Sequence, residues 1–358
     1  MTSMFGRLAD LTPPRGIDAV NAVTDGYKAY QALCTAIDVG LFPWLAAKGP
    51  SDRKTILAAL GMKGMYMSSF LQTLVDARLL DLNGDRYALT QAARDCLLPG
   101  DRWYQGDTVV ALKGAYSPWG DLTALLCEEP PAPDQPGAVR VQRLRAEQLL
   151  RGEVQAVART LLGYVDAQTA DSLLDLGGNS GMFAIALCQL NRDLSATVLA
   201  GPGELELARS LVAEHGMEAR IAVLPGHPLE SDLGLGHDIV LAAHALYGVR
   251  QQVADVFRRA ALALRPGGLL VSCHWFCREG CEPSSSGLRD MDKCVTAGGH
   301  PLCHVERFGG LMLEAGFDGL TQLDFQGPYG LGKLHIGTLL GAAPGEKAGG
   351  TAGRGCGC

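Results

Sequence analysis

The chain has 358 residues, of which 47% are hydrophobic and 19% are charged, and its formal net charge is −7. This length exceeds the roughly 100–200 residues of a typical domain, and this composition is typical of folded chains, so we expect two globular domains. The acidic balance disfavours a nucleic-acid partner, while the absence of a signal-peptide pattern and of about 18 uninterrupted apolar residues predicts a cytoplasmic protein without a membrane partner.

Residues 1–105 are expected to form a mainly helical domain. Apolar residues recur at helical spacing over residues 19–46, and a second helical pattern covers residues 65–77. Asn83-Gly84 lies between two short apolar runs, which predicts a tight hairpin turn. Helices followed by a small hairpin are typical of a winged-helix-like domain. Residues 106–165 are expected to form connecting helices, interrupted by a Pro-rich loop.

The pattern changes in residues 166–340, where short apolar strands alternate with helices. The expected strands cover residues 172–178, 196–200, 220–226, 238–244 and 269–275. This alternation predicts an α/β, Rossmann-like fold with a doubly wound, mostly parallel sheet. The last segment, 341–358, is rich in glycine and is expected to be a flexible tail.

A glycine loop follows the first of these strands and opens a helix. It consists of Asp175, Leu176, Gly177, Gly178, Asn179, Ser180 and Gly181. Glycines permit a tight turn and let backbone N–H groups approach a ligand at the helix N-terminus. The same arrangement occurs in dinucleotide-binding folds, so the loop indicates a nucleotide-like ligand without identifying it.

The motifs around this loop resemble those of the class I S-adenosylmethionine (SAM) dependent small-molecule O-methyltransferases. LLDLGGNSG is similar to the first SAM motif of that family, and five further segments follow in the family's order: ATVLAGPGELELAR, RIAVLPGHPLE, DIVLAAHALYG, LRPGGLLV and LMLEAGF. Upstream, DVGLFPWLA and LVDARLL resemble the family's winged-helix dimerisation domain, and AYSPWGDLTALL resembles its connecting helix. The resemblance covers roughly residues 18–340.

The resemblance implies a homodimeric enzyme that binds SAM and methylates a small molecule. It implies cofactor contacts at Asp175, Gly177, Gly178, Asn179, Gly181, Gly201, His227 and Ala243. In this family the winged helix is a dimer interface that also lines the substrate pocket, a role that agrees with the acidic net charge.

Two positions that hold the cofactor in this family carry other residues here. Ala200 ends the second strand, where the family has a carboxylate that accepts both ribose hydroxyls. Glu204, four residues later, either replaces that acid or is a solvated residue in the first turn of a helix. His227 stands where the family has an acid on the adenine side. It either forms a hydrogen bond with the adenine edge or is a surface histidine.

The family's catalytic His-Asp pair is replaced by Tyr247-Gly248. Histidine suits proton abstraction because its ordinary pKa lies near neutrality, whereas tyrosine, with an ordinary pKa of about 10, is better suited to orienting the acceptor. The same exchange of Tyr for His occurs in bacteriochlorophyllide ring methyltransferases, which methylate carbon and which this segment also resembles. His244, three residues earlier, is the second catalytic candidate, either as a base or as a structural residue.

The chain has 11 cysteines without a secretory context, so reduced thiols are expected. Cys273, Cys277 and Cys281 recur at intervals of four, and Cys356 and Cys358 end the tail. Because thiolates are soft ligands, these five residues are the candidate ligands of a thiophilic metal. The alternative is that they fill space as small apolar groups, which is the usual role of free cysteines.

Two functions are consistent with these features. The first is SAM-dependent methyl transfer to a small molecule, with an oxygen, a carbon, a thiol or a metalloid as the acceptor. The second is a catalytically altered protein of the same fold that binds a metal or a partner through its cysteines. The intact glycine loop favours the first function, whereas Ala200 and Tyr247 favour the second.

Overall fold

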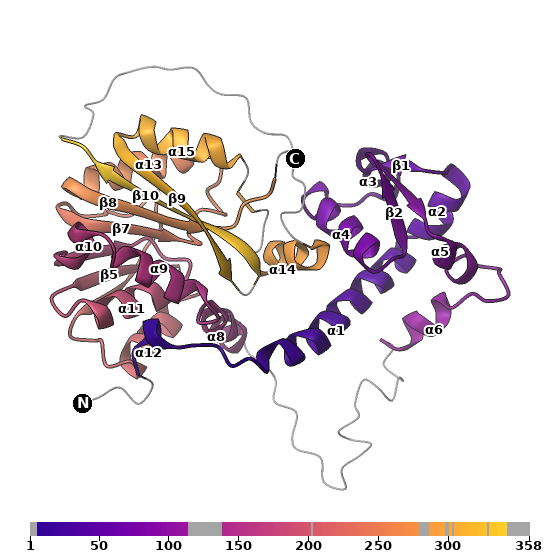
Figure 1. Cartoon of the computed structure of the whole chain (residues 1–358), viewed down its shortest axis with the longest axis horizontal. Helices are drawn as coiled ribbons and strands as arrows, with labels where there is room; N and C mark the ends of the chain where they lie inside the picture. The colour runs from indigo at the N-terminus through magenta and orange to yellow at the C-terminus, as the bar shows by residue number, and fades with distance from the viewer. Residues whose placement is uncertain are drawn as a thin grey trace, which may run out of the picture. The chain divides into compact units, whose positions relative to one another are not determined.

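The computed structural model describes residues 6–113, 138–201, 203–278, 286–297, 301–302, 304–327 and 329–341 (Figure 1). The segments expected as a Pro-rich loop, as the motif AYSPWGDLTALL and as the tail beyond residue 341 lie outside these ranges. Among the described helices, none combines the length and the apolar character needed to span a membrane.

The chain folds into two compact units that do not follow the order of the sequence. The helical unit takes its described residues from Arg15–Gln135 and Ser285–Cys294. The sheet unit takes them from Met1–Pro14, from Pro136–Ser284 and from Val295 onward. Each unit therefore contains a segment from the opposite half of the chain.

The helical unit packs helices around a small antiparallel sheet. Its elements are α1 (Ile17–Asp38), α2 (Leu41–Lys48), β1 (Ser51–Asp52), α3 (Arg53–Leu60), α4 (Gly64–Asp76), β2 (Leu80–Asn83), β3 (Arg86–Leu89), α5 (Gln91–Cys96) and α6 (Gly106–Ala111). The predicted hairpin is confirmed, because β2 pairs antiparallel with β3 and Gly84 between them has a φ of 64°. Phe42, Ile56 and Leu71 are among the fully buried side chains of its core.

Side-chain caps define where two of these helices begin. Asp52 accepts the N–H of Thr55 (3.0 Å) at the start of α3, and Thr90 accepts the N–H of Ala93 (3.3 Å) at the start of α5. Gly61 ends α3 in the left-handed conformation, with a φ of 61°. Local chemistry therefore determines these boundaries, as it does in isolated helices.

Helix α14 (Gly287–Ala297) comes from far downstream, yet its described residues up to Cys294 belong to the helical unit. The N–H of Gly287 donates to Asp76 (2.8 Å), and Lys28 forms an ion pair with Asp292 (2.6 Å). These contacts join α14 to α4 and to α1. The helical unit is therefore completed by a helix from the other half of the chain.

The sheet unit is a doubly wound α/β domain with a seven-stranded sheet in the order β6-β5-β4-β7-β8-β10-β9 (Figure 1). Its elements are η1 (Leu8–Asp10), α8 (Ala138–Leu149), α9 (Glu153–Leu161), α10 (Val165–Gln168), β4 (Ser172–Asp175), α11 (Met182–Leu190), β5 (Ser195–Ala200), α12 (Leu205–Glu214), β6 (Ile221–Pro225), β7 (His237–Ala243), α13 (Val253–Ala263), β8 (Leu264–His274), α15 (Val305–Glu314), β9 (Phe317–Gly327) and β10 (Gly330–Leu339). Strands β4 to β8 pair in parallel, so the predicted fold class is confirmed.

The central strands are buried on both faces, which explains their unbroken apolar sequences. In β7, Ile239 and Leu241 face the core formed with α9 and α11, whereas Val240 and Ala242 face the core formed with α13 and α15. Side chains alternate between the two faces because the period of a strand is two residues.

Strands β9 and β10 are absent from the predicted set. They form an antiparallel hairpin, and β10 inserts between β8 and β9. Most side chains of β9 are exposed or half-buried, because it is the edge strand of the sheet. Its sequence therefore lacks the continuous apolar run by which the central strands are found.

Candidate active site

The strand order reverses beside β4, and this reversal locates the candidate site. Along the chain, β5 and β6 follow β4 on one side, and β7 and β8 follow on the other. In open α/β sheets such a switch leaves a crevice at the carboxyl ends of the central strands, where ligands bind. The glycine loop begins at the end of β4, and His244 comes directly after β7. The strand order alone therefore places the glycine loop and His244 at the same edge of the sheet.

The carboxylate of Asp175 organises the glycine loop. It is fully buried and accepts hydrogen bonds from the N–H of Gly177 (2.9 Å) and from the side-chain amide of Asn179 (3.0 Å). Asn179 also accepts the N–H of Gly181 (2.9 Å) and donates to the carbonyl of Ala243 (3.4 Å). Burial raises the pKa of Asp175 to about 7, although both hydrogen bonds oppose this rise. The loop is therefore held in shape before any ligand binds.

Two glycines of the loop lie against neighbouring backbone. A Cβ on Gly177, which has a φ of 90°, would lie 2.3 Å from the carbonyl oxygen of Leu199. A Cβ on Gly178, which has a φ of 81°, would lie 2.7 Å from the carbonyl oxygen of His244. Both distances are shorter than real Cβ contacts, so a side chain at either position would displace the segment after β7 or the end of β5. Glycine is required at both positions.

A cavity of about 210 Å³ opens beside the loop. The side chains and backbone that line it are Gln142, Arg145, Ala146, Leu149, Gly178, Asn179, Ser180, Glu204, His244, Tyr247, Trp275 and Tyr329. The glycine loop and both catalytic candidates therefore share one cavity.

The cavity contains only part of the predicted cofactor set. Ala200 is buried at the end of β5 and does not line it, and neither do Gly201 and the exposed His227. Glu204 does line it, and the N–H of Gly178 donates to its carboxylate. Burial raises the pKa of Glu204, against that hydrogen bond. Of the two alternatives for Glu204, this position favours a role in binding over that of a solvated surface residue.

His244 and Tyr247 belong to one hydrogen-bonded chain. Nδ1 of His244 lies 2.8 Å from Oη of Tyr247, and Nε2 lies 2.5 Å from Oε1 of Glu153. Oη of Tyr247 also accepts the backbone N–H of Trp275 (2.9 Å). Glu153 is the first residue of α9 and is fully buried, 91 residues before His244. The two catalytic candidates, His244 and Tyr247, are therefore in contact, and the carboxylate of Glu153 contacts the other ring nitrogen of His244.

Backbone contacts fix the segment that follows β7. His244 has a φ of 59°, and its N–H donates to the carbonyl of Cys273 (3.0 Å). Nε2 of His274 accepts the N–H of Leu246 (3.2 Å), while its Nδ1 bonds to Oγ of Ser272 (2.9 Å). Burial lowers the pKa of His274 well below its ordinary range, so the ring stays neutral and remains an acceptor. His274 therefore has a structural role.

Three important residues of this site escaped the sequence analysis: Trp275 and Tyr329, which line the cavity, and Glu153, which contacts His244 from outside it. One signal for Glu153 was present, because it is in helical phase with the buried Val157 and Leu161 of α9, which places a carboxylate on the apolar face of the helix. Trp275 and Tyr329 lie in loops after β8 and β9, and no periodicity marks them.

The predicted cysteine ligands do not converge in the described part of the chain. Cys273 is fully buried, and its thiol donates to Oε1 of Glu153 (3.3 Å). Cys277 is half-buried and lines a different cavity. The other three candidates lie outside the described residues: Cys281, Cys356 and Cys358.

Glu153, His244 and Cys273 form a group whose possible ligand atoms all lie within 4.8 Å of one another. Two ligand atoms on one tetrahedral zinc lie about 3.3 Å apart or more, whereas Glu153 Oε1 and His244 Nε2 are 2.5 Å apart. Burial raises the pKa of the Cys273 thiol well above its usual value, and the nearby Glu153 adds to this. A protonated thiol is a poor metal ligand. The group fits a hydrogen-bonded cluster, and the thiophilic metal is not supported.

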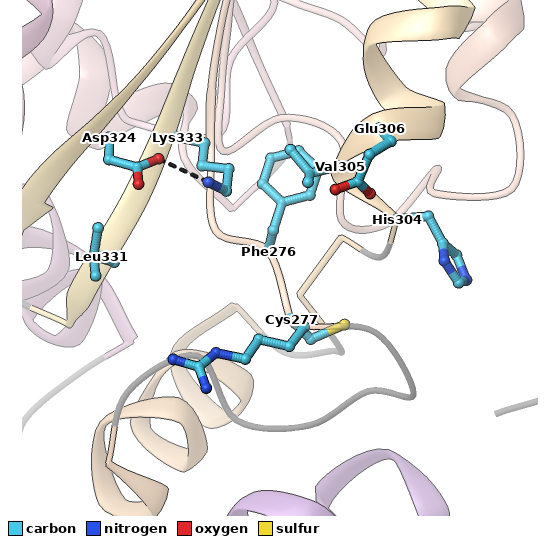
Figure 2. Close-up of a pocket in the computed structure, with 9 residues that line it drawn as sticks. Phe276, Cys277, His304, Val305, Glu306, Asp324, Leu331 and Lys333 are labelled. Atoms are coloured by element: carbon cyan, nitrogen blue, oxygen red, sulfur yellow. Dashed lines mark hydrogen bonds and ion pairs between the residues drawn. The ribbon is translucent and has the colours of Figure 1, made fainter.

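The larger cavity, of about 560 Å³, lies near the start of α15 (Figure 2). Figure 2 shows Phe276 between the ion pair of Asp324 and Lys333 (2.7 Å) and the first turn of α15, with Cys277 below. Neither the glycine loop nor His244 lines this cavity. Volume alone therefore does not identify the site, and the smaller cavity is the one that combines a nucleotide-type loop with ionisable groups.

The helical unit is similar to a known domain. Residues 22–99 match the family model of the O-methyltransferase dimerisation domain. This match covers most of α1 and the elements as far as α5. The predicted dimerisation domain is therefore confirmed.

Full-length relatives extend the match to both units. The N,N-dimethyltransferase OxyT of Streptomyces rimosus is 28% identical over 320 residues, which cover 86% of this chain and 92% of that protein. The bacteriochlorophyllide d C-20 methyltransferase of Chlorobaculum tepidum is 23% identical over 269 residues, or 70% of this chain and 75% of that protein. Among solved structures, an O-methyltransferase family 2 protein from Planctomyces limnophilus in complex with apigenin has a TM-score of 0.64 at 18% identity, covering 93% of this chain and 98% of that chain, which shows a shared fold.

These relatives share methyl transfer and differ in the atom that they methylate. They confirm the predicted resemblance, that to the bacteriochlorophyllide enzymes included, and the predicted class of enzyme. They lend no support to the alternative of an altered protein that binds a metal or a partner through its cysteines. The chain is therefore a relative of the SAM-dependent small-molecule methyltransferases and carries their O-methyltransferase dimerisation domain.

Proposed function

We propose that the protein transfers the methyl group of SAM to a small molecule bound in the cavity beside the glycine loop. The observation that carries the proposal is that Gly178 and Asn179 line this cavity together with His244 and Tyr247. A methyl donor on the loop and an acceptor beside His244 would meet there. Holding two reactants in line converts a bimolecular step into an effectively unimolecular one, which is a large part of catalysis.

In this proposal the loop Asp175–Gly181 and Ala243 hold SAM, and Glu204 takes the ribose contact that Ala200 does not offer. The cavity of about 210 Å³ is smaller than the roughly 300–1,000 Å³ of most small-molecule sites. SAM therefore extends beyond it, along the ends of β5 and β6, and Gly201 and His227 are the residues that we assign to that extension. Opening of the cavity accompanies binding of both reactants.

The acceptor side of the cavity is aromatic. The ring of Trp275 lies 4.5 Å from that of His244 and 4.9 Å from that of Tyr329. Aromatic walls favour a flat, largely apolar ligand with one polar end. We therefore propose an aromatic acceptor, methylated at a hydroxyl or at a carbon that a neighbouring hydroxyl activates.

Calorimetric titration of the full-length, reduced, metal-free protein with S-adenosylhomocysteine (SAH) tests this function. We expect one site per chain with a micromolar dissociation constant, because the loop is already held in shape by Asp175 and Asn179. Absence of binding by SAM and SAH at millimolar concentration would contradict the proposal.

Glu204→Gln should weaken SAH binding by about tenfold or more, because a hydrogen bond to a charged group contributes about 1.5–3 kcal/mol. Ala200→Asp should tighten binding, since it restores a carboxylate at the end of β5. Glu206→Gln is the matched control, because Glu206 is an exposed acid on the same helix. Equal affinities of Glu204→Gln and Glu206→Gln would rule out the ribose role.

A homodimer through the helical unit is the expected assembly. Val20, Val23 and Tyr27 of α1 are 63%, 76% and 65% exposed, and their spacing places three large apolar side chains along one side of the helix. Light scattering should give about twice the 37.8 kDa of one chain. Val23→Glu should shift the mass toward one chain, whereas Leu262→Glu, at a single exposed apolar residue of α13, should not. A monomeric wild-type protein at micromolar concentration would contradict the dimer.

A further inference from the structure

We propose that Glu153, His244 and Tyr247 form a proton relay, in which Tyr247 takes the proton of the acceptor hydroxyl and passes its own proton to His244. The inference rests on the proposed function and specifies its chemistry. Tyr247 is then a catalytic residue, and Glu153 is a positioning residue that acts through His244.

Both ring nitrogens of His244 are engaged. Nε2 lies 2.5 Å from Oε1 of Glu153, and Nδ1 lies 2.8 Å from Oη of Tyr247. An ionised carboxylate only accepts hydrogen bonds, so Nε2 carries the hydrogen and Nδ1 is the acceptor of the neutral ring. His244 therefore has no second nitrogen for direct contact with a substrate. A proton from the cavity reaches it through the hydroxyl of Tyr247.

The backbone N–H of Trp275 determines the direction of the Tyr247 hydroxyl. It donates to Oη (2.9 Å), so the hydrogen of the hydroxyl is available for Nδ1 of His244. The same N–H stabilises negative charge on Oη while that hydrogen moves, as preorganised backbone donors do at other developing oxyanions. One donor therefore both orients the relay and lowers its barrier.

Glu153 stabilises the charge that the relay creates. Its side chain is fully buried, and Oε2 has no hydrogen-bond partner among the described residues. A buried carboxylate with an unpaired oxygen is unfavourable until a cation lies beside it. Arrival of a proton on His244 supplies that cation at 2.5 Å. Glu153 is the first residue of α9, and a helix N-terminus favours negative charge.

The backbone of His244 is strained at this point. Its φ of 59° lies in the left-handed region, which residues other than glycine rarely adopt. Strain of this kind gathers at functional sites, where surrounding contacts maintain it. Here the N–H of His244 is held by the carbonyl of Cys273 (3.0 Å), and the turn brings His244 and Tyr247 to the same cavity.

The transfer step balances in atoms and charge. The acceptor oxygen forms a bond to the methyl carbon as the bond from that carbon to the sulfonium sulfur breaks. The acceptor proton moves to Oη of Tyr247, and the original Tyr247 proton moves to Nδ1 of His244. The products are the methyl ether, SAH and an imidazolium paired with Glu153. One positive charge has passed from SAM to His244, and that proton leaves to solvent when the products depart.

A kinetic test uses SAM with substituted phenols and naphthols of graded acidity, and measures SAH formation. With phenols whose pKa is about 10, Tyr247→Phe should lower kcat by about 100-fold, a typical contribution of a positioned proton acceptor. With nitrophenols that are already ionised at the assay pH, the loss should stay below about threefold, because no proton has to move. Glu153→Gln should show the same dependence on acceptor acidity. An equal loss with both groups of acceptors would overturn the relay.

A second test observes His244 without turnover. In full-length protein with ¹⁵N-labelled histidines, the relay requires a neutral His244 ring with its hydrogen on Nε2. Tyr247→Phe should shift the Nδ1 resonance, and Glu153→Gln should weaken the preference for this tautomer, while His237 outside the cavity serves as the internal control. Unchanged His244 resonances in both variants would overturn the relay, even if no phenol is methylated. Failure of the wild-type protein to bind SAH would instead overturn the proposed function.

Discussion

Replacement of Gly178 by alanine should lower the affinity for SAH by more than about 100-fold. The residue has a φ of 81°, and its added Cβ would lie 2.7 Å from the carbonyl carbon and oxygen of His244 and 2.8 Å from the nitrogen of Ala245. Backbone atoms cannot rotate away as a side chain does. An alanine in the left-handed conformation costs about 1–2 kcal/mol, and the free loop relieves this strain and the clash by leaving the conformation that binds SAH. Binding must then restore that conformation, and each 1.4 kcal/mol that this costs is a factor of ten in affinity. Calorimetry with SAH measures the loss, and circular dichroism reports whether the fold is retained.

Gly181→Ala is the matched control for this prediction. Its φ of 80° equals that of Gly178 within a degree, but the atoms nearest to its added Cβ are the methyl groups of Val198, at 3.7 and 3.8 Å. It therefore carries the same backbone strain without the clash. We expect a loss of about 5–30-fold, which corresponds to about 1–2 kcal/mol. Equal losses in the two variants would show that contact with the segment after β7 does not matter.

Asp290→Ala should destabilise the helical unit by about 3–5 kcal/mol. The side chain of Asp290 is 5% exposed and that of Lys293 is 0% exposed, and the two are 2.8 Å apart on α14. Removing the acid takes away the carboxylate that lies 2.8 Å from the buried Lys293 cation, and breaking a buried ion pair is far less favourable than breaking an exposed one. Hydrogen exchange at the amides of α1 and α4 in the full-length protein measures this loss of stability, because α14 contacts both helices.

Two further variants test whether burial of the ion pair is the cause of the destabilisation expected in Asp290→Ala. Glu206→Ala removes an ion pair with Arg209 in which the side chains are 80% and 50% exposed, and we expect a change below about 1 kcal/mol. Asp290→Leu combined with Lys293→Met replaces the buried pair by apolar groups, and we expect stability close to that of the wild type. A loss below about 1 kcal/mol in Asp290→Ala would contradict a stabilising role for the buried pair.

Much of the fold was predictable because burial leaves a clear pattern in the sequence. The central strands, such as β7 with Ile239 to Ala243, are covered on both faces and are apolar without interruption. The edge strand β9 is covered on one face at most, so its sequence alternates weakly and was missed. The affiliation of α14 with the helical unit was also not predictable, since it depends on pairings such as Lys28 with Asp292 that are distant in sequence.

The residues of the candidate site could be predicted where a single short segment of the sequence was enough to identify them. The glycine loop, Tyr247 and His244 each lie within a short motif. Glu153 was missed because its role depends on a contact with a residue 91 positions away, and only its phase on the buried face of α9 hinted at it. The metal site predicted from the cysteines was not supported, because a regular spacing in the sequence does not imply that the side chains meet. Cys277 lines the larger cavity, whereas the thiol of Cys273 is buried against Glu153.

The discontinuity of the helical unit has a consequence for how the protein is made. On the ribosome, residues as far as 135 emerge first, but the unit is complete only after residue 294 has been synthesised. At about 5–20 residues per second, the intervening 160 or so residues take roughly 10–30 s. During that interval α4 lacks the contact with Gly287, and α1 lacks the partner of Lys28. The helical unit, which contains the residues that match the dimerisation domain, is therefore complete only after most of the sheet unit has been synthesised.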